Sequence, residues 1–150
     1  MGTLRVETER TVAADPSEVF GLVSDYAEGR PRYLPPNYEG YEVEEGGRGA
    51  GTTVRYVLHA ARRERPYRMQ VTQPDAGLTV VEKDAGSSLT TTWTVVPAPD
   101  GKRSTVRVAS QWQGAGGVGG FFERIFAPGG LKRIHDDTLA RLARVLEVGE

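Results

Sequence analysis

Two histidines, His59 and His135, carry the side chains best suited to proton transfer near neutral pH. His59 lies on a predicted strand face among polar residues, where we expect it to be exposed. His135 follows Ile134 in a helical pattern, could face an interior, and opens the run His135-Asp136-Asp137, which resembles an acid–base cluster. Because neighbouring residues of a helix point in different directions, these three side chains are not expected to converge. A half-buried histidine beside two solvated acids is the favoured interpretation.

Metal and cofactor chemistry finds little support in the sequence. The chain has no cysteine, which excludes disulfides, thiolate metal ligands and thiol catalysis. Its two histidines lack the spacing of a metal-binding pair. Residues Gly114–Gly119 match G-x-G-x-x-G, but the chain continues into a helix and offers no second strand ending in an acid. A flexible glycine link is therefore favoured, and we expect neither a metal nor a cofactor.

Basic residues gather in two predicted turns, which raises the question of nucleic-acid binding: Arg62, Arg63, Arg65 and Arg68, then Lys102 and Arg103. The formal net charge is only -1, and no aromatic residues are interleaved with the basic run at 62–65, so solvated hairpin tips are the better interpretation. No stretch approaches the length of a membrane span, and the first residues lack an apolar signal core. We expect a cytoplasmic protein that neither binds nucleic acid nor inserts into membranes.

The elements that must position these residues begin with a strand and a short helix. Leu4 to Ala13 alternates, so that Val6, Thr8, Arg10 and Val12 share one face, which places Arg10 unusually on the inner side. Asp15-Pro16-Ser17-Glu18 predicts a helix start, with the aspartate as N-cap and the proline at the first position. The proline-rich residues 27–37 predict one short turn ending in an exposed or half-buried Tyr33-Leu34.

From Tyr38 the chain predicts six strands at short spacing with no helix between them, which indicates an antiparallel meander. The closing stretch Phe121–Val148 has helical spacing, as one amphipathic helix or as two pieces broken at Pro128-Gly129-Gly130. Residues 1–150 thus predict one α+β domain in which a curved seven-stranded sheet wraps around a long C-terminal helix. A strongly twisted sheet curls, so an apolar cavity beside the helix is expected.

The inner faces of these elements carry large rings and a few polar groups. Each residue alone is best interpreted as core, but together they suit an apolar pocket with placed polar groups. If Arg10 and Glu82 are both buried, they must pair or find ligand partners, and a structural ion pair is favoured over a catalytic acid. The aromatic first turns of the closing helix, Phe121 to Phe126, are the expected gate. The candidate ligand-binding residues are Arg10, Tyr33, Tyr56, Tyr67, Met69, Glu82, Trp93, Ser110, Trp112, Phe122, Phe126 and His135.

The segment Val12-Ala13-Ala14-Asp15-Pro16-Ser17-Glu18-Val19-Phe20, followed by Val23-Ser24-Asp25-Tyr26, resembles the START-like helix-grip superfamily (SRPBCC). Within that superfamily, the chain is most similar to the polyketide cyclase/dehydrase and lipid-transport group. The resemblance implies a hydrophobic cavity between sheet and helix, but no single reaction. Cyclases of this group use a cavity arginine and tyrosine. Tyr38 falls near the place of such a tyrosine, whereas Thr72 takes the arginine's place, which argues against cyclase chemistry.

Three functions follow as hypotheses. The first is binding of a small hydrophobic molecule, such as a lipid or polyketide, without catalysis. The second is an enzyme of the cyclase/dehydrase type, in which Glu82, His135 or Tyr38 would position and protonate a substrate. The third is an interaction module of the co-chaperone kind, for which a large exposed apolar patch would be the sign. No convergent acid, base and nucleophile can be identified, which favours the first.

Overall fold

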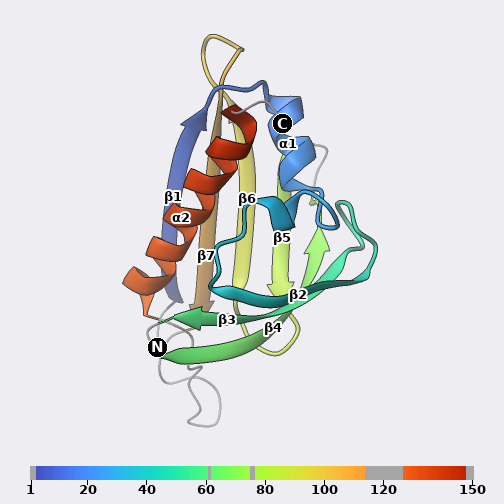
Figure 1. The fold of residues 1–150 in the computed structure, drawn as a ribbon, viewed down its shortest axis with the longest axis vertical. Coiled ribbons are helices and arrows are strands. Elements are labelled where there is room, and N and C mark those ends of the chain that lie inside the picture. Colours follow the sequence, from blue (N-terminus) through green and yellow to red (C-terminus); the bar gives the residue numbers. More distant parts are fainter. Residues whose placement is uncertain (1–2, 61, 75–76, 114–126, 148–150) are drawn as a thin grey trace.

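The computed structural model describes residues 3–60, 62–74, 77–113 and 127–147, and in this part of the chain the predicted order of elements is found (Figure 1). A strand and two short helices precede six strands, and a long helix closes the chain. The elements are β1 (Thr3–Val12), α1 (Pro16–Val23), the 3-10 helix η1 (Arg30–Arg32), β2 (Tyr38–Glu45), β3 (Thr53–Ala60), β4 (Arg63–Thr72), β5 (Thr79–Asp84), β6 (Thr90–Pro97), β7 (Ser104–Gln113) and α2 (Pro128–Glu147).

The seven strands form one antiparallel sheet in the order β1-β7-β6-β5-β4-β3-β2. Every consecutive pair from β2 to β7 is a neighbour in the sheet, which confirms the predicted meander. The first strand joins the far edge beside β7. Figure 1 shows β2, β3 and β4 sweeping across the direction of the other strands, so the sheet curls around the helix as expected of a strong twist.

The closing helix lies along β1 on the concave face of the sheet (Figure 1). It buries Leu131, Ile134, Leu139 and Leu142 at the predicted helical spacing. The helix begins at Pro128, so Pro128-Gly129-Gly130 is its first turn, and residues 121–126, on which the choice between one helix and two pieces depends, lie outside the described residues. A proline is tolerated there because the first N–H groups of a helix have no partner within the helix. The expected gate, Phe121 to Phe126, lies outside the described residues.

The first helix is set by the local chemistry of its start. The Asp15 carboxylate accepts hydrogen bonds from the backbone N–H groups of Ser17, at 2.9 Å, and Glu18, at 3.0 Å. These bonds satisfy donors that the helix itself leaves free. The predicted N-cap is therefore confirmed. The helix buries Val19 and Val23 against the sheet.

The proline-rich segment after α1 differs from its prediction at one important position. It forms η1 as the predicted short turn, but Tyr33 is completely buried rather than exposed or half-buried. The close approach of η1 to α1 depends on Gly29, where a Cβ atom would lie 2.9 Å from the carbonyl oxygens of Leu22 and Asp25. This approach carries Arg30 and Tyr33 into the core.

Alternation identified the inner faces of the central strands correctly. Val54 and Leu58 of β3, Tyr67 and Met69 of β4 and Trp112 of β7 are all buried. The prediction for β1 was wrong at Arg10, which is exposed although Val6 and Val12 of the same strand are buried. β1 is an edge strand, so a long charged side chain can extend from it into water.

Candidate functional site

A cavity lies between the curled sheet, η1 and α2. The space open to the centre of a water molecule in it is about 20 Å³, enough to hold water but small for a larger molecule. Four of its side chains, Leu34, Tyr38, Tyr41 and Tyr56, are half-buried. The lining residues are Arg30, Leu34, Tyr38, Tyr41, Val54, Tyr56, Leu58, Glu82, Leu89, Thr91, Trp93, Ser110, Leu131 and His135.

A buried ion pair forms one wall of this cavity. Arg30 Nη1 of η1 lies 3.0 Å from Glu82 Oε2 of β5, and each side chain is only 6% exposed. The Tyr26 hydroxyl donates to the same carboxylate oxygen at 2.7 Å. Arg30 also donates from Nε to the Tyr33 hydroxyl at 2.9 Å and from Nη2 to the Val23 carbonyl at 3.1 Å. A buried pair persists when its remaining polar atoms are satisfied in this way.

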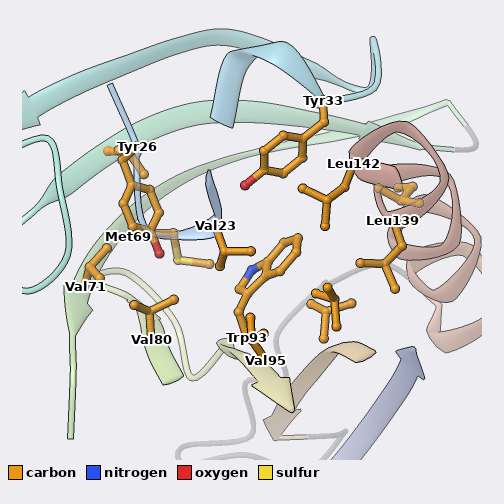
Figure 2. Close-up of a cluster of buried hydrophobic side chains, with 14 of the residues drawn as sticks. Val23, Tyr26, Tyr33, Met69, Val71, Val80, Trp93, Val95, Leu139 and Leu142 are labelled. Atoms are coloured by element: carbon orange, nitrogen blue, oxygen red, sulfur yellow. The ribbon is translucent and has the colours of Figure 1, made fainter. Parts of the chain in front are cut away.

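Aromatic rings surround the same guanidinium. The Arg30 Cζ atom lies 4.5 Å from the ring centre of Tyr26 and 4.6 Å from that of Trp93. Tyr33 meets Trp93 edge-on at 6.2 Å. Figure 2 shows Tyr26, Tyr33 and Trp93 in one cluster, with Leu142 of α2 packed beside it. The faces of these rings are electron-rich, so they stabilise the buried cation beyond the ion pair.

Burial and neighbouring charges shift the pKa values of Arg30 and Tyr26 in this network. Burial alone would lower the pKa of Arg30, but the Glu82 carboxylate and the neighbouring tyrosines raise it well above its ordinary value. Burial, together with the charge of Glu82, raises the pKa of Tyr26 well above its ordinary value. The guanidinium therefore stays charged and the phenol keeps its proton.

Three tyrosines form the half-buried side of the cavity. Tyr38 meets the ring of Tyr56 edge-on at 4.9 Å, and Tyr41 stacks on Tyr56 at 6.4 Å. The Tyr41 hydroxyl donates to the Tyr26 carbonyl at 2.7 Å. Burial raises the pKa of all three phenols above its ordinary value. They can donate or accept hydrogen bonds at neutral pH, but they do not act as bases there.

His135 enters the cavity from α2. Its Nε2 atom lies 2.8 Å from Ser110 Oγ, and Ser110 Oγ lies 2.6 Å from Thr91 Oγ1. Burial lowers the pKa of His135 from 6.5 to about 4, Asp136 acting against this shift and Arg30 with it. The imidazole is therefore neutral at pH 7.

The neighbouring acids point elsewhere, as predicted. Asp136 bonds Thr8 and, at 3.2 Å, Lys132, while Asp137 bonds Arg141 at 3.2 Å. The run His135-Asp136-Asp137 therefore forms no acid–base cluster.

Six of the predicted site residues line the cavity: Tyr38, Tyr56, Glu82, Trp93, Ser110 and His135. Four others are buried without lining it: Tyr33, Tyr67, Met69 and Trp112. Arg10 is exposed and does not lie on the inner face, as was predicted for it. Thr72 on β4 is also exposed. Phe122 and Phe126 lie outside the described residues.

The condition set for a pairing of Glu82 with Arg10 is not met, because Arg10 is exposed, and the cation that meets Glu82 is Arg30. Arg30 comes from an irregular segment without a periodic pattern of burial. The sequence there gives no sign that Arg30 is buried while Arg32 is exposed. Tyr41 was missed as a lining residue because β2 changes register between Glu39 and Glu42, which breaks the alternation. A buried glutamate on a strand was the one signal that a cation must lie near.

Metal-binding clusters and membrane-spanning helices are both absent from the described residues. No cluster of three or more histidine, aspartate or glutamate side chains there could hold a metal ion. No helix among them is both long and apolar enough to cross a membrane.

Comparison with known proteins identifies the family to which this chain belongs. The family model described as "Polyketide cyclase / dehydrase and lipid transport" matches residues 3–147. The chain therefore belongs to this family, within the START-like helix-grip (SRPBCC) superfamily, as the N-terminal segment suggested. A search of curated protein sequences found no significant match.

Among solved structures, the KanY protein, determined in solution by NMR, is 44% identical to this chain, with a TM-score of 0.84 and coverage of 98% of this chain and 99% of KanY. The Zhui aromatase/cyclase from Streptomyces sp. R1128 is 18% identical, with a TM-score of 0.75 and coverage of 97% and 94%. A START superfamily protein from Mycobacterium smegmatis is 19% identical, with a TM-score of 0.66 and coverage of 97% and 95%. The last two show that the fold is shared.

Proposed function

We propose that this protein binds a small, mostly apolar molecule in the cavity between the sheet and α2. The observation that carries the proposal is the lining itself, in which aliphatic and aromatic side chains enclose a few polar groups with defined partners. Ligand pockets are built in this way, because apolar surface supplies affinity and a few polar groups fix orientation. Membership of the family supports the same function.

The cavity must widen to admit such a molecule, since only about 20 Å³ is open to the centre of a water molecule. We expect the side chains of Leu34, Tyr38 and Tyr56 to be the ones that move, because they are only half-buried. Arg30 and Glu82 are held by their mutual ion pair and by Tyr26. We therefore place the entrance at Leu34, Tyr38 and Tyr56 and the fixed end of the pocket at the ion pair.

Catalysis of the cyclase type has weaker support. Glu82 already accepts from Arg30 and Tyr26 on one oxygen, and the buried tyrosines keep their protons at neutral pH. His135 is a weak base, because burial lowers its pKa to about 4. Neither Tyr38 nor His135 is poised to exchange a proton near pH 7, and Glu82 is engaged in the ion pair with Arg30.

An interaction module of the co-chaperone kind also has little support. The large apolar side chains that are exposed among the described residues are Leu4 and Val96, on different strands. Two separate residues of this kind are ordinary on a soluble surface.

The proposal can be tested with a matched pair of substitutions on β3. Val54 lines the cavity, whereas Val57 is half-buried and faces the other side of the same strand. Native mass spectrometry of protein purified from its own host should show a co-purifying small molecule with the wild type and with Val57→Phe. Val54→Phe should lose it, because the larger ring fills the pocket.

Thermal unfolding of both variants confirms that they are folded before the spectra are compared. Equal occupancy of the wild type and a folded Val54→Phe variant would place the bound molecule outside this cavity and refute the proposal. Wild-type protein that carries no small molecule and binds no lipophilic probe would refute it as well.

A further inference from the structure

Strand β2 forms a thin wall between the cavity and solvent. Its tyrosines Tyr38 and Tyr41 line the cavity, whereas its glutamates Glu39 and Glu42 are exposed. β2 is an edge strand, and β3 is its neighbour in the sheet. No residue of β2 is buried, whereas every other strand buries two residues or more. Moving β2 outward therefore exposes little apolar surface.

β2 is also longer than the part of β3 that it covers. Between their first and last register partners, β2 has eight residues and β3 has six, residues 53–58. Two register shifts accommodate the extra residues. Gly40 lies within the first shift, between Glu39 and Glu42, and has a φ of 67°, which glycine adopts more readily than other residues. Each shift interrupts the ladder of backbone hydrogen bonds, so β2 is attached less regularly than the other strands.

Ion pairs hold this irregular strand to its neighbours. β2 carries four glutamates and no basic residue. Glu42 Oε1 lies 2.5 Å from Arg55 Nη2 of β3. Glu44 Oε2 lies 3.3 Å from Arg55 Nε, and Glu44 Oε1 lies 2.8 Å from Arg68 Nε of β4. The four side chains form one chain of charges across three strands. Both arginines are more than half exposed, so the attraction weakens as salt is added.

We propose that β2 is a strap that opens to admit the ligand, and that this chain of ion pairs holds it closed. The inference rests on the proposed binding function and adds the step that controls entry. Opening moves Tyr38 and Tyr41 away from Tyr56 of β3, against which their rings pack. The bond from the Tyr41 hydroxyl to the Tyr26 carbonyl breaks in the same movement. The cavity thereby widens without disturbing the buried ion pair at its fixed end.

Stopped-flow binding of N-phenyl-1-naphthylamine tests the inference, because charges on the protein do not steer this uncharged fluorescent probe. Glu42→Gln/Glu44→Gln should bind the probe roughly three- to tenfold faster than the wild type, because the lost ion pairs no longer favour the closed strap. The matched control is Glu7→Gln/Glu9→Gln. It removes two glutamates that pair with Arg107 at the other edge of the sheet, and it should bind at the wild-type rate.

Salt provides a second readout of the same ion pairs. Raising the NaCl concentration from about 20 mM to about 500 mM should speed binding to the wild type and to Glu7→Gln/Glu9→Gln. Glu42→Gln/Glu44→Gln should respond much less, because the charges that salt screens have already been removed.

A disulfide between β2 and β3 tests the movement directly. Glu39 and Val57 are register partners, and the chain has no cysteine of its own, so Glu39→Cys/Val57→Cys allows one bond. Oxidation should slow binding by at least about tenfold, and reduction should restore the rate. Arg5→Cys/Gln111→Cys joins register partners of β1 and β7 and should bind at one rate in both states.

Thermal unfolding establishes that each variant is folded, and loss of the probe in Val54→Phe locates it in the cavity. Equal association rates in the wild type, Glu42→Gln/Glu44→Gln and the oxidised cysteine pair would refute the strap and leave the binding function standing. A changed dissociation constant at an unchanged association rate would also refute it, because the acids would then act on the bound molecule. If the folded wild-type protein binds no probe, the inference and the proposed function both fail.

Discussion

Arg30 carries a positive charge into the core because its partners compensate for the loss of water. The guanidinium has a carboxylate at 3.0 Å, a hydroxyl at 2.9 Å and a backbone carbonyl at 3.1 Å. Aromatic rings cover its faces. A network of this kind is most sensitive to the loss of one member, since the remaining charge is then buried without a partner.

Substitution of either member of the ion pair should therefore be strongly destabilising. Arg30→Met and Glu82→Leu should each lower the free energy of unfolding by about 3–5 kcal/mol. The double substitution should cost less than the sum of the two, with a coupling energy of about 2 kcal/mol. Urea denaturation of the wild type and the three variants measures these values.

The exposed pair of Arg107 and Glu9 supplies the control, since its side chains are 41% and 54% exposed. Arg107→Met should change the free energy of unfolding by less than about 1 kcal/mol. Additive costs for Arg30→Met and Glu82→Leu would show that the two residues do not depend on each other.

His135 should make stability depend on pH in a defined window. The folded protein keeps this imidazole neutral down to about pH 4, because burial lowers its pKa, whereas the unfolded chain protonates it below 6.5. Between these values the unfolded state binds more protons, so stability falls as the pH is lowered from 6.5 to 4. Above 6.5 this contribution is fully present, and over the window about 3 kcal/mol is lost.

Urea denaturation at several pH values checks the expectation. The slope of unfolding free energy against pH should be smaller in His135→Asn than in the wild type between pH 6.5 and 4. An unchanged slope in His135→Asn would mean that the imidazole is not held neutral by burial.

At the scale of elements, the contact of η1 with α1 determines whether Arg30 reaches Glu82. Gly29 makes this contact possible, because a side chain there would meet two backbone carbonyl oxygens at 2.9 Å. Backbone atoms cannot rotate away as the end of a long side chain can. The sheet supplies the carboxylate of Glu82, and η1 supplies the guanidinium of Arg30. The ion pair therefore depends on the close approach of η1 to α1.

A matched pair of glycine substitutions separates steric fit from helix propensity. Gly29→Ala should destabilise the protein by about 1–3 kcal/mol, because the added methyl group forces the backbone apart. Gly21→Ala, within α1 and with no atom within 4 Å of the added Cβ, should be stabilising by about 0.5–1 kcal/mol.

Thermal unfolding of the two glycine variants should give shifts of opposite sign. A stabilising effect of both substitutions would show that η1 has room to move away from α1 without loss.

At the scale of the whole molecule, the sheet and the long helix enclose a pocket whose two ends differ. One end is fixed by Arg30 and Glu82, which are buried and paired. The other is lined by half-buried side chains, among them Tyr38 and Tyr56. The variants Val54→Phe and Val57→Phe test whether a small molecule occupies this pocket. The pocket is formed by several strands and by the helices η1 and α2, so the test is of the molecule as a whole.

Much of this arrangement could be predicted from the sequence, but unevenly. Glu82, Trp93 and Ser110 were assigned to the inner side by alternation along regular strands, and they line the cavity. Arg30 could not be found in this way, because it lies in a proline-rich turn with no period. Tyr41 was hidden by the irregular register of β2, where Gly40 has a φ of 67°.

The sequence by itself determined the order of elements, the inner faces of the central strands and the start of α1. These features depend on side chains a few positions apart, such as Asp15 and the N–H groups that it caps. Only the tertiary structure decided which cation meets Glu82, how far burial lowers the pKa of His135, and how much space the cavity retains. Tyr26 and Glu82 are 56 residues apart in the chain, but in the fold the Tyr26 hydroxyl lies 2.7 Å from Glu82 Oε2. Partners of this kind are set by how the sheet curls and where the helices pack, because local spacing does not determine which distant side chains share a buried space.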